Sequence, residues 1–278
     1  MKNMKKIPYA KIGDEGKFIL IEGLNGSGKT TQAKLLERAL AEEGKIALYN
    51  HEPTDGLLGK IIRAIIEKRP IIESEVEIDN FLEKFFPKSN PHNDAILQAT
   101  KVVLKQFQNG KVRNEEAKRQ LLFIIDRLFD IKEIIQPALR QNHWVVQDRY
   151  DISCYLHGMA NGLDFNYLIK HHARILGENY LAPNLVIFYW VPVKVALQRL
   201  ADSGKTIDLY ENTQTLKKIE KAARWLFSFR FQSPSPGHSL RRKLQVGDKK
   251  VRVFIVNAEA PIAEIFEETW GILENIKI

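Results

Sequence analysis

The sequence has only one cysteine, Cys154, among its 278 residues. A single cysteine excludes an internal disulfide bond and any cysteine-rich metal cluster. No apolar segment forms the roughly 20-residue run that a membrane-spanning helix requires, and no signal-peptide apolar stretch follows the basic segment Met1 to Lys6. Internal repeats and low-complexity tracts are also missing. From these absences we expect a soluble, cytoplasmic protein with no membrane partner.

The composition, 44% apolar and 27% charged residues, suffices for one large core and only marginally for two. We therefore expect a single domain over residues 1–278. The formal net charge of +8 favours an anionic partner. A nucleotide, a nucleic acid and solvent ions all fit this charge.

Short apolar runs rich in β-branched residues alternate with longer amphipathic runs, which is typical of an α/β protein with a parallel sheet. The expected strands are residues 17–22, 45–49, 143–147, 185–191 and 251–256. The expected helices are residues 28–43, 57–68, 114–140, 165–176, 194–201, 212–229 and 262–276. Two segments interrupt the alternation. Residues 70–110 are expected to form a helical insertion, and the basic residues 233–250 a loop or hairpin insertion.

A complete phosphate-binding motif lies between the first apolar run and the helical pattern that starts at Thr31. Its residues match the P-loop pattern G-x-x-x-x-G-K-[ST] and are Gly23, Leu24, Asn25, Gly26, Ser27, Gly28, Lys29 and Thr30. The glycines let backbone N–H groups face a phosphate chain. Lys29 is expected to reach the outer phosphates, and the Thr30 hydroxyl is expected to bind Mg²⁺. The pattern predicts a nucleotide site, and a tight structural turn is the alternative.

A P-loop also needs an acidic residue near the metal, at the carboxyl end of a neighbouring strand. Asp148 follows the expected strand 143–147 directly. A carboxylate there can hold Mg²⁺ or its waters beside Thr30, and the adjoining Arg149 can neutralise transferring phosphates. The alternative is a helix cap followed by a surface arginine.

Four segments give the chain a more specific resemblance: Phe18 to Gln32, Glu52 to Arg63, Leu121 to Arg127 and Val145 to Ser153. They carry the patterns Leu-Leu-Phe-x-x-x-Arg and Asp-Arg-Tyr-x-x-Ser beside the P-loop. In this the chain resembles the thymidylate kinase family, which transfers the γ-phosphoryl group of ATP to dTMP. The resemblance implies an α/β P-loop NTPase fold with a five-stranded parallel sheet flanked by helices. It also implies ATP and dTMP as substrates, Mg²⁺ as cofactor, ATP contacts from the whole P-loop and Thr31, and a homodimer.

The resemblance further implies that Phe123 stacks on the thymine ring and that Arg127 donates to its edge oxygen. Their i, i+4 spacing supports this independently, because such residues lie one above the other on a helix. Core packing is the alternative for Phe123, and a solvated ion pair with Glu133 or Asp130 is the alternative for Arg127.

By the same resemblance, Arg149 contacts the acceptor phosphate and Ser153 lies in the first turn of a helix under the base. Glu52 belongs to a loop at the phosphate end of the pocket. The lid over ATP is expected at residues 202–212, with Lys205 as its catalytic cation and Arg199 as the alternative cation.

The chain departs from the family at several site positions. Asn25 stands where a carboxylate usually faces the acceptor's sugar, and His51 stands where many relatives have arginine. Cys154 and His157 follow Ser153 where the family usually has a second hydroxyl residue and a tyrosine-containing segment. We expect these changes to alter base and sugar selectivity.

Two other features of the sequence do not indicate a functional site. The adjacent His171 and His172 do not form a metal-binding face and are expected to be exposed. The basic residues 241–252 lack interleaved aromatic residues, so a solvated hairpin is favoured over a nucleic-acid site. Two alternatives to a dTMP kinase stay open: a kinase for another nucleotide or nucleoside, and a P-loop ATPase switch that binds nucleic acid or a protein partner.

Overall fold

The computed structural model describes residues 16–66, 114–204, 208–228, 235, 237–246 and 249–276. The predicted insertion at 70–110 and the predicted cation Lys205 lie outside these residues. The predicted lid is described only at residues 202–204 and 208–212.

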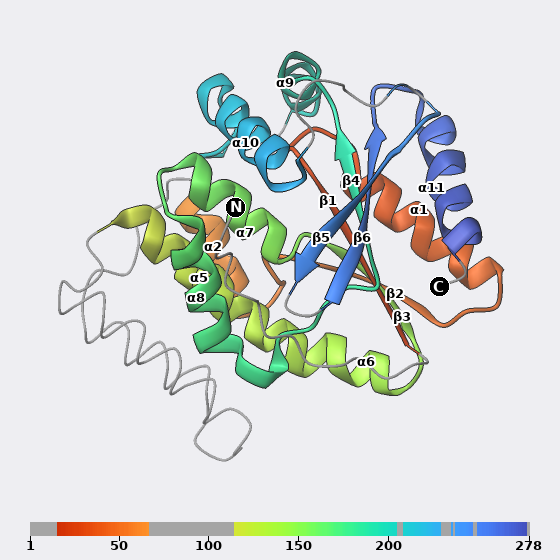
Figure 1. Cartoon of the computed structure of the whole chain (residues 1–278), viewed down its shortest axis with the longest axis horizontal. Helices are drawn as coiled ribbons and strands as arrows, with labels where there is room; N and C mark the ends of the chain where they lie inside the picture. The colour runs from red at the N-terminus through yellow and green to blue at the C-terminus, as the bar shows by residue number, and fades with distance from the viewer. Residues whose placement is uncertain are drawn as a thin grey trace.

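The centre of the molecule is a six-stranded sheet with strand order β2-β3-β1-β4-β6-β5 (Figure 1). Five strands are mutually parallel along this order. They are β1 (Lys17–Gly23), β2 (Ala47–His51), β3 (Trp144–Asp148), β4 (Leu185–Trp190) and β6 (Lys249–Asn257). The predicted α/β fold with a parallel sheet is confirmed for these strands, and the apolar strand β4 at the centre of the sheet is buried between helix layers.

The sheet has one more strand than the sequence predicted. β5 (Leu240–Val246) pairs antiparallel with β6, so the late insertion is a hairpin that extends the sheet. Its sequence, LRRKLQV, carries three cations in seven residues, which suits an edge strand because charge there discourages pairing with other chains. Because of the same charges, the sequence predicted a solvated loop or hairpin and not a strand of the central sheet.

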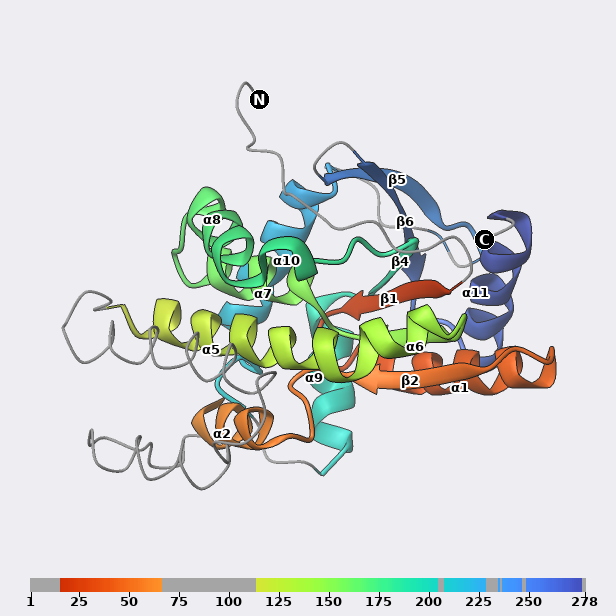
Figure 2. The same cartoon turned by 90° about the horizontal axis from the view of Figure 1, so that it is seen from below.

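Helices cover both faces of the sheet (Figures 1 and 2). On one face, α1 (Lys29–Glu42) packs against α11 (Ile262–Ile276). On the other face, α7 (Asp151–Ala160) contacts β1, α5 (Glu115–Asp130) and α10 (Thr213–Leu226). The remaining described helices are α2 (Leu57–Ile66), α6 (Gln136–Arg140), α8 (Phe165–Leu176) with the 3₁₀ turn η2 (Gly177–Asn179), and α9 (Val193–Asp202).

The predicted helix over 114–140 is divided into α5 and α6 by a π-helical segment, η1 (Ile131–Ile135). Asn114 starts α5 by accepting a hydrogen bond from the Ala117 N–H at 3.1 Å, and two glutamates follow in the first turn. Both features stabilise a helix N-terminus. Among the described residues, no helix has both the length and the apolar character needed to cross a bilayer.

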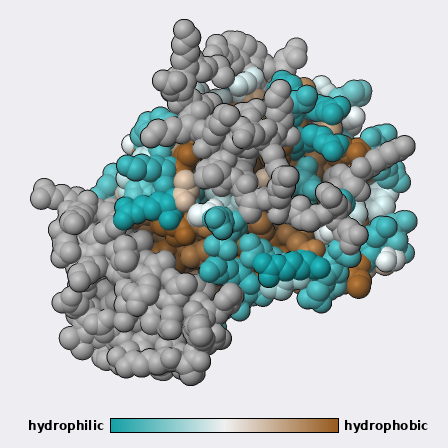
Figure 3. Space-filling view, turned by 60° about the horizontal axis from the view of Figure 1, so that its bottom comes forward, coloured by the Kyte–Doolittle hydropathy of each residue, from teal (hydrophilic) through white to brown (hydrophobic). Residues whose placement is uncertain are grey.

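The core lies mainly between the sheet and its helices, and every residue of β4 is buried. On the face shown in Figure 3, apolar residues lie in a hollow between hydrophilic ones. Because the parallel strands run the same way, the loops after β1, β2 and β3 meet at one carboxyl edge of the sheet, where open α/β folds bind ligands.

Candidate functional site

The P-loop connects β1 to the N-terminus of α1. Gly26 and Gly28 have φ angles of 79° and 86°, in the left-handed region that favours glycine. A Cβ atom on Gly26 would lie 2.4 Å from the Ala196 carbonyl oxygen, so this position also needs glycine for space. The loop therefore has the curled backbone that directs N–H groups of a helix start towards an anion.

A large cleft lies over this loop. Predicted nucleotide-binding residues 25–31 line it, together with Asp148, Arg149 and Arg199. Gly23 and Leu24 do not belong to its lining. Leu24 is 2% exposed and packs in the core, because the loop turns this side chain inward.

Lys29 and Thr30 occupy the positions that the motif predicts. Burial, followed by the charge of Arg149, lowers the pKa of Lys29 to about 8, and Asp148 partly opposes that shift. The Lys29 Nζ atom lies 3.4 Å from the Leu24 carbonyl oxygen. A buried ammonium beside a second cation is a strong site for anionic phosphate oxygens.

Thr30 and Asp148 come together from α1 and β3. The Thr30 hydroxyl donates to Oδ2 of Asp148, while the buried Oδ1 has no hydrogen-bond partner within the described ranges. Those ranges contain no cluster of three or more acidic, histidine or cysteine side chains suited to a metal. A hydroxyl and one carboxylate fit Mg²⁺, which commonly takes few protein ligands and completes its shell with waters and substrate phosphates.

Arg149 is held by side-chain contacts to α7 and to the P-loop. Its φ angle is 72°, uncommon for a residue with a side chain. Its Nη1 donates to the Ser153 hydroxyl oxygen at 2.9 Å, and its Nη2 donates to Oδ1 of Asn25. Ser153 lies in the first turn of α7, as expected, and donates in turn to Oε2 of Glu22 at 2.7 Å.

Glu22 was not predicted as a site residue, because it stands inside an apolar run in the sequence. Its side chain is fully buried, and Oε1 accepts from the backbone N–H groups of Tyr150 and Ser153, both at 3.0 Å. Glu22 thus caps the N-terminus of α7 from a different element and fixes the turn that carries Arg149.

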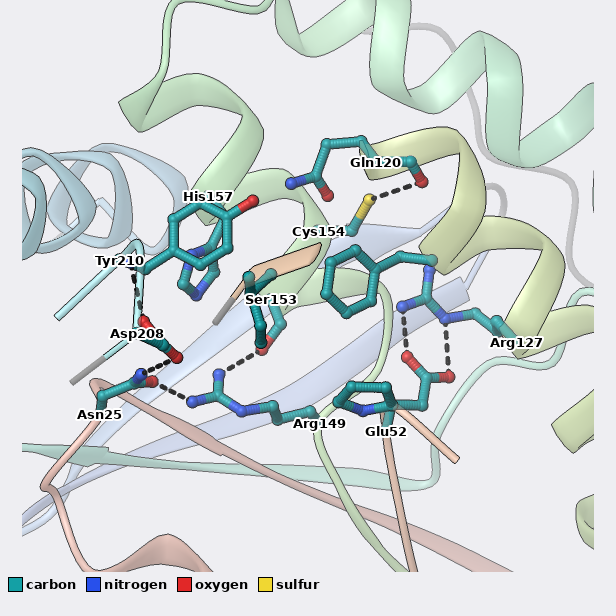
Figure 4. A pocket seen from close by; sticks show the side chains of 13 residues that line it. Asn25, Glu52, Gln120, Arg127, Arg149, Ser153, Cys154, His157, Asp208 and Tyr210 are labelled. Atoms are coloured by element: carbon teal, nitrogen blue, oxygen red, sulfur yellow. Dashed lines mark hydrogen bonds and ion pairs between the residues drawn. The ribbon is translucent and has the colours of Figure 1, made fainter. Parts of the chain in front are cut away.

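A second cavity of about 460 Å³ adjoins the nucleotide cleft (Figure 4). The structure brings all of the predicted acceptor residues to its wall: Asn25, Glu52, Phe123, Arg127, Arg149, Ser153, Cys154 and His157. The wall also includes Pro53, Ile66, Gln120, Asp208 and Tyr210. Ile66 and Gln120 were not predicted as site residues, and Asp208 and Tyr210 belong to the segment that was expected to cover ATP.

The predicted base contact Arg127 is 1% exposed rather than solvated. Its Nε and Nη2 donate to the Glu52 carboxylate at 2.9 and 2.5 Å, and its guanidinium lies 4.9 Å from the Tyr150 ring centroid. Although burial opposes the charged form, Glu52 holds the pKa of Arg127 well above its usual range. Glu52, and not one of the alternative partners considered from the sequence, forms the buried ion pair that the structure shows for Arg127.

The expectation that His171 and His172 are exposed was wrong, because His171 is half-buried and His172 lies in the core. The His172 ring is fully buried, its Nδ1 lies 2.8 Å from the Leu168 carbonyl oxygen, and its Nε2 lies 2.6 Å from Nη1 of Arg127. Because Arg127 can only donate, Nε2 accepts and Nδ1 carries the proton. Burial and then Arg127 lower the pKa of His172 well below its usual value. The helical pattern of α8 did not indicate that this face meets α5.

Cys154 and His157 line the acceptor cavity from α7. Burial raises the pKa of Cys154 to about 12, so the thiol is protonated and unsuited to nucleophilic chemistry. The His157 ring packs edge to face on Tyr210 with 4.5 Å between centroids. Burial lowers the pKa of His157 well below its usual value, so the ring is neutral. Tyr155, in contrast, points into the core, where its hydroxyl lies 2.6 Å from that of Tyr180.

The described end of the expected lid segment contacts the P-loop. Asn25 Nδ2 donates to Oε1 of Glu211 at 2.9 Å and to Oδ2 of Asp208 at 3.4 Å. Burial, followed by Glu211, raises the pKa of Asp208 to about 6. Arg199, the alternative lid cation, donates to the carbonyl oxygens of Ala258 at 2.8 Å and Glu259 at 3.4 Å. It therefore orders the loop after β6 as well as lining the nucleotide cleft.

The loop after β2 is fixed from two sides. Asp126 accepts from the Thr54 N–H at 2.8 Å and from its hydroxyl at 2.7 Å. Arg63 donates to the carbonyl oxygens of Pro53 at 2.7 Å and Thr54 at 2.5 Å. Asp126 is thus a structural anchor for the loop that carries Glu52.

Comparisons with known proteins agree with this geometry. The family model described as Thymidylate kinase matches residues 21–86 and 89–233. The probable thymidylate kinase of Pyrococcus horikoshii is 32% identical over 204 residues, which cover 73% of this chain and 79% of the relative. The probable thymidylate kinase of Thermococcus gammatolerans is 27% identical over 260 residues, covering 94% and 97%. The thymidylate kinase of Brachyspira hyodysenteriae is 26% identical over 208 residues, covering 74% and 79%.

Proposed function

Because the chain belongs to the thymidylate kinase family and is a phosphotransferase that acts on dTMP, we propose that its two adjoining clefts hold ATP and dTMP. One observation carries this assignment. Asn25, Glu52 and Arg149 line both clefts. The phosphate ends of a donor in one cleft and an acceptor in the other would therefore meet at Arg149, as an in-line transfer requires.

In the nucleotide cleft, the P-loop backbone and Lys29 bind the phosphates of ATP. Thr30 and Asp148 hold Mg²⁺ or its waters. The bound Mg²⁺ supplies positive charge that neutralises oxygens of the phosphate chain. Lys205, outside the described residues, is proposed as the lid cation that joins Lys29 at the γ-phosphate.

In the transfer step, an oxygen of the dTMP phosphate forms a bond to the γ-phosphorus of ATP. The bond from that phosphorus to the oxygen shared with the β-phosphate breaks, and dTDP and ADP result. The acceptor phosphate is already anionic near neutral pH, so no general base is required. Arg149 contacts both phosphate groups and stabilises the charge that moves between them.

In the acceptor cavity, Phe123 stacks on the base and Arg127 donates to a base oxygen. Asn25 and His157 face the sugar, with Ser153 and Cys154 on the same wall. Glu52 accepts hydrogen bonds from Arg127 and thereby orients the guanidinium that contacts the base. The homodimer, the single domain over residues 1–278 and a cytoplasmic location stay predictions from the sequence.

The test is ADP formation from ATP with dTMP, dUMP, dCMP, UMP or no acceptor. We expect ADP to form with dTMP, together with an equal amount of dTDP. A related kinase would prefer another acceptor, whereas a P-loop ATPase switch would release ADP at the same rate without any monophosphate.

A further inference from the structure

The acceptor cavity contains a buried carbonyl group that no sequence motif indicated. Gln120 lies on α5 and is 1% exposed, yet it forms part of the cavity wall (Figure 4). Its Oε1 atom is buried and has no hydrogen-bond partner in the part of the chain that the structure describes. A buried acceptor without a donor is unfavourable, so its presence in a ligand cavity points to a donor on the ligand.

The orientation of the Gln120 amide is fixed by its neighbour Glu116. Gln120 Nε2 donates to Oε1 of Glu116 at 2.5 Å. Glu116 is itself 4% exposed and is ion-paired with Arg119 at 3.0 Å. The Tyr210 hydroxyl donates to the same carboxylate at 3.2 Å. An ion-paired carboxylate only accepts hydrogen bonds, so the NH₂ group of Gln120 must face Glu116 and the carbonyl must face away from it.

The positions of three residues on α5 make this carbonyl relevant to a base. Gln120, Phe123 and Arg127 are spaced i, i+3 and i+7, so they lie along one face of the helix. All three line the cavity. The face therefore presents an acceptor, a flat ring and a donor in that order, with the ring between the two polar groups.

We propose that Gln120 Oε1 accepts a hydrogen bond from the imide N3–H of the pyrimidine base of the acceptor, an inference that rests on the proposed function. The imide edge of thymine or uracil places an N–H donor beside a carbonyl oxygen. The donor meets Gln120, and the carbonyl oxygen meets the guanidinium of Arg127. Cytosine has an unprotonated N3 and an exocyclic amine at these places, so both contacts would be mismatched.

The proposal separates two kinds of selectivity. Gln120 distinguishes imide bases from cytosine, but thymine and uracil share the imide edge, so it does not distinguish dTMP from dUMP. Unpaired buried polar groups give strong rejection of a mismatched substrate, and large discrimination against dCMP is expected.

The experiment measures kcat/KM of the full chain for dTMP, dCMP and N3-methyl-dTMP, which lacks the N3–H donor. We compare the wild type with Gln120→Met, which keeps most of the side-chain length but has no carbonyl. The variant is expected to lose about tenfold in kcat/KM for dTMP, mainly through KM, and to leave N3-methyl-dTMP almost unchanged. Gln141→Met is the matched control, because this exposed glutamine lies at the end of α6 and donates to the Pro137 carbonyl oxygen.

A second variant tests the orientation argument. In Glu116→Gln, an amide replaces the carboxylate, so Gln120 is no longer forced to present its carbonyl. We expect the ratio of kcat/KM for dCMP to that for dTMP to rise in this variant, which a purely structural role of Glu116 would not produce. ATP affinity reports that each variant is folded, because the nucleotide cleft does not include either residue.

The possible failures are distinguishable. If the wild type releases ADP but phosphorylates no nucleotide, the proposed function fails and this inference fails with it. If dTMP is phosphorylated and folded Gln120→Met keeps the wild-type ratio of dTMP to N3-methyl-dTMP activity, only the assignment of Gln120 is overturned.

Discussion

At the residue scale, the site depends on charged side chains that are buried beside other charged side chains. Lys29 is 6% exposed, yet its neighbours include both the cation Arg149 and the carboxylate Asp148. Repulsion from Arg149 and loss of water destabilise the ammonium in the free protein. Phosphate oxygens would relieve both effects, so we expect ATP to raise the pKa of Lys29 above its ligand-free value of about 8.

Lys29→Met is expected to reduce kcat by about 10²- to 10³-fold. The variant loses the positive charge that neutralises the transferring phosphoryl group, while the methionine side chain keeps most of the volume of the lysine alkyl chain. Steady-state ADP formation measures the loss, and circular dichroism checks the fold. Lys45→Met, at an exposed lysine before β2, is the control and should retain full activity. Near-normal turnover in folded Lys29→Met would remove Lys29 from the mechanism.

His172 predicts a pH dependence of stability. Its pKa in the folded protein lies well below the ordinary value of about 6.5, so the unfolded chain binds a proton first as the pH falls. The contribution of neutral His172 is therefore complete above pH 6.5 and is lost as the pH falls towards the folded-state pKa. The loss is about 1.4 kcal/mol per pH unit within that window.

Urea unfolding at pH 7.5, 6.5 and 5.5 measures this effect. His172→Gln has no titrating ring but can still accept from Arg127, so its stability should fall less steeply than that of the wild type. His143→Gln, at a half-buried histidine just before β3, should leave the slope unchanged. Equal slopes for the wild type and His172→Gln would contradict the buried neutral ring.

The sequence patterns predicted the residues that line the acceptor cavity better than they predicted the buried polar residues around them. The predicted acceptor positions from Asn25 to His157 do meet in one cavity, because they follow strands whose carboxyl ends share an edge or lie on one helix face. Glu22, Gln120 and His172 escaped prediction. Each is a polar residue in an apolar or amphipathic segment, and its partner is decided by tertiary packing that neither propensity nor periodicity contains.

At the element scale, α2 packs closely against the loop after β2. The position of this helix therefore affects the shape of the acceptor cavity, because the same loop carries Glu52. A Cβ atom on Gly59 would lie 1.9 Å from the Thr54 carbonyl oxygen. Backbone atoms would have to move to remove this steric clash. Thr54 is also held by Asp126 and Arg63. The close approach of helix and loop therefore requires glycine at position 59.

Gly59→Ala is expected to destabilise the protein by about 1 to 3 kcal/mol through overpacking. It should also weaken dTMP binding, because the displaced loop carries Glu52, the partner of Arg127. Gly271→Ala is a matched control in α11, where a Cβ atom meets nothing within 4 Å. This control should be neutral or stabilising, since alanine is the better helix former. Thermal unfolding and dTMP titration measure both effects, and equal behaviour of the two variants would refute the close contact.

The elements themselves were predictable to different degrees. β1 and β4 each contain a continuous apolar segment and were found within one residue. The charged edge strand β5 was not recognised as part of the sheet. The single helix expected over 114–140 missed η1, because a π-helical segment keeps the amphipathic pattern and differs only in its backbone hydrogen bonds.

At the scale of the whole molecule, two clefts share one edge of the sheet and a few residues between them. A ligand in either cleft binds the folded chain and not the unfolded one, so each should raise the melting temperature. At a concentration of 100 times Kd, one ligand adds about 2.7 kcal/mol to the free energy of unfolding. For a protein of this size, that corresponds to several degrees.

Metal removal should separate the two ligands. Thr30 and Asp148 belong to the nucleotide cleft and not to the wall of the acceptor cavity. We therefore expect EDTA to reduce the rise in melting temperature that ATP with Mg²⁺ produces, and to leave the rise produced by dTMP unchanged. Thr30→Val removes the hydroxyl while keeping the side-chain shape. It should shrink the Mg²⁺-dependent part of the ATP effect, with the dTMP effect as its internal control. An ATP-induced rise that is the same with EDTA and with Mg²⁺ would show that Thr30 and Asp148 do not support metal binding, and their hydrogen bond would then be only a tie between α1 and β3.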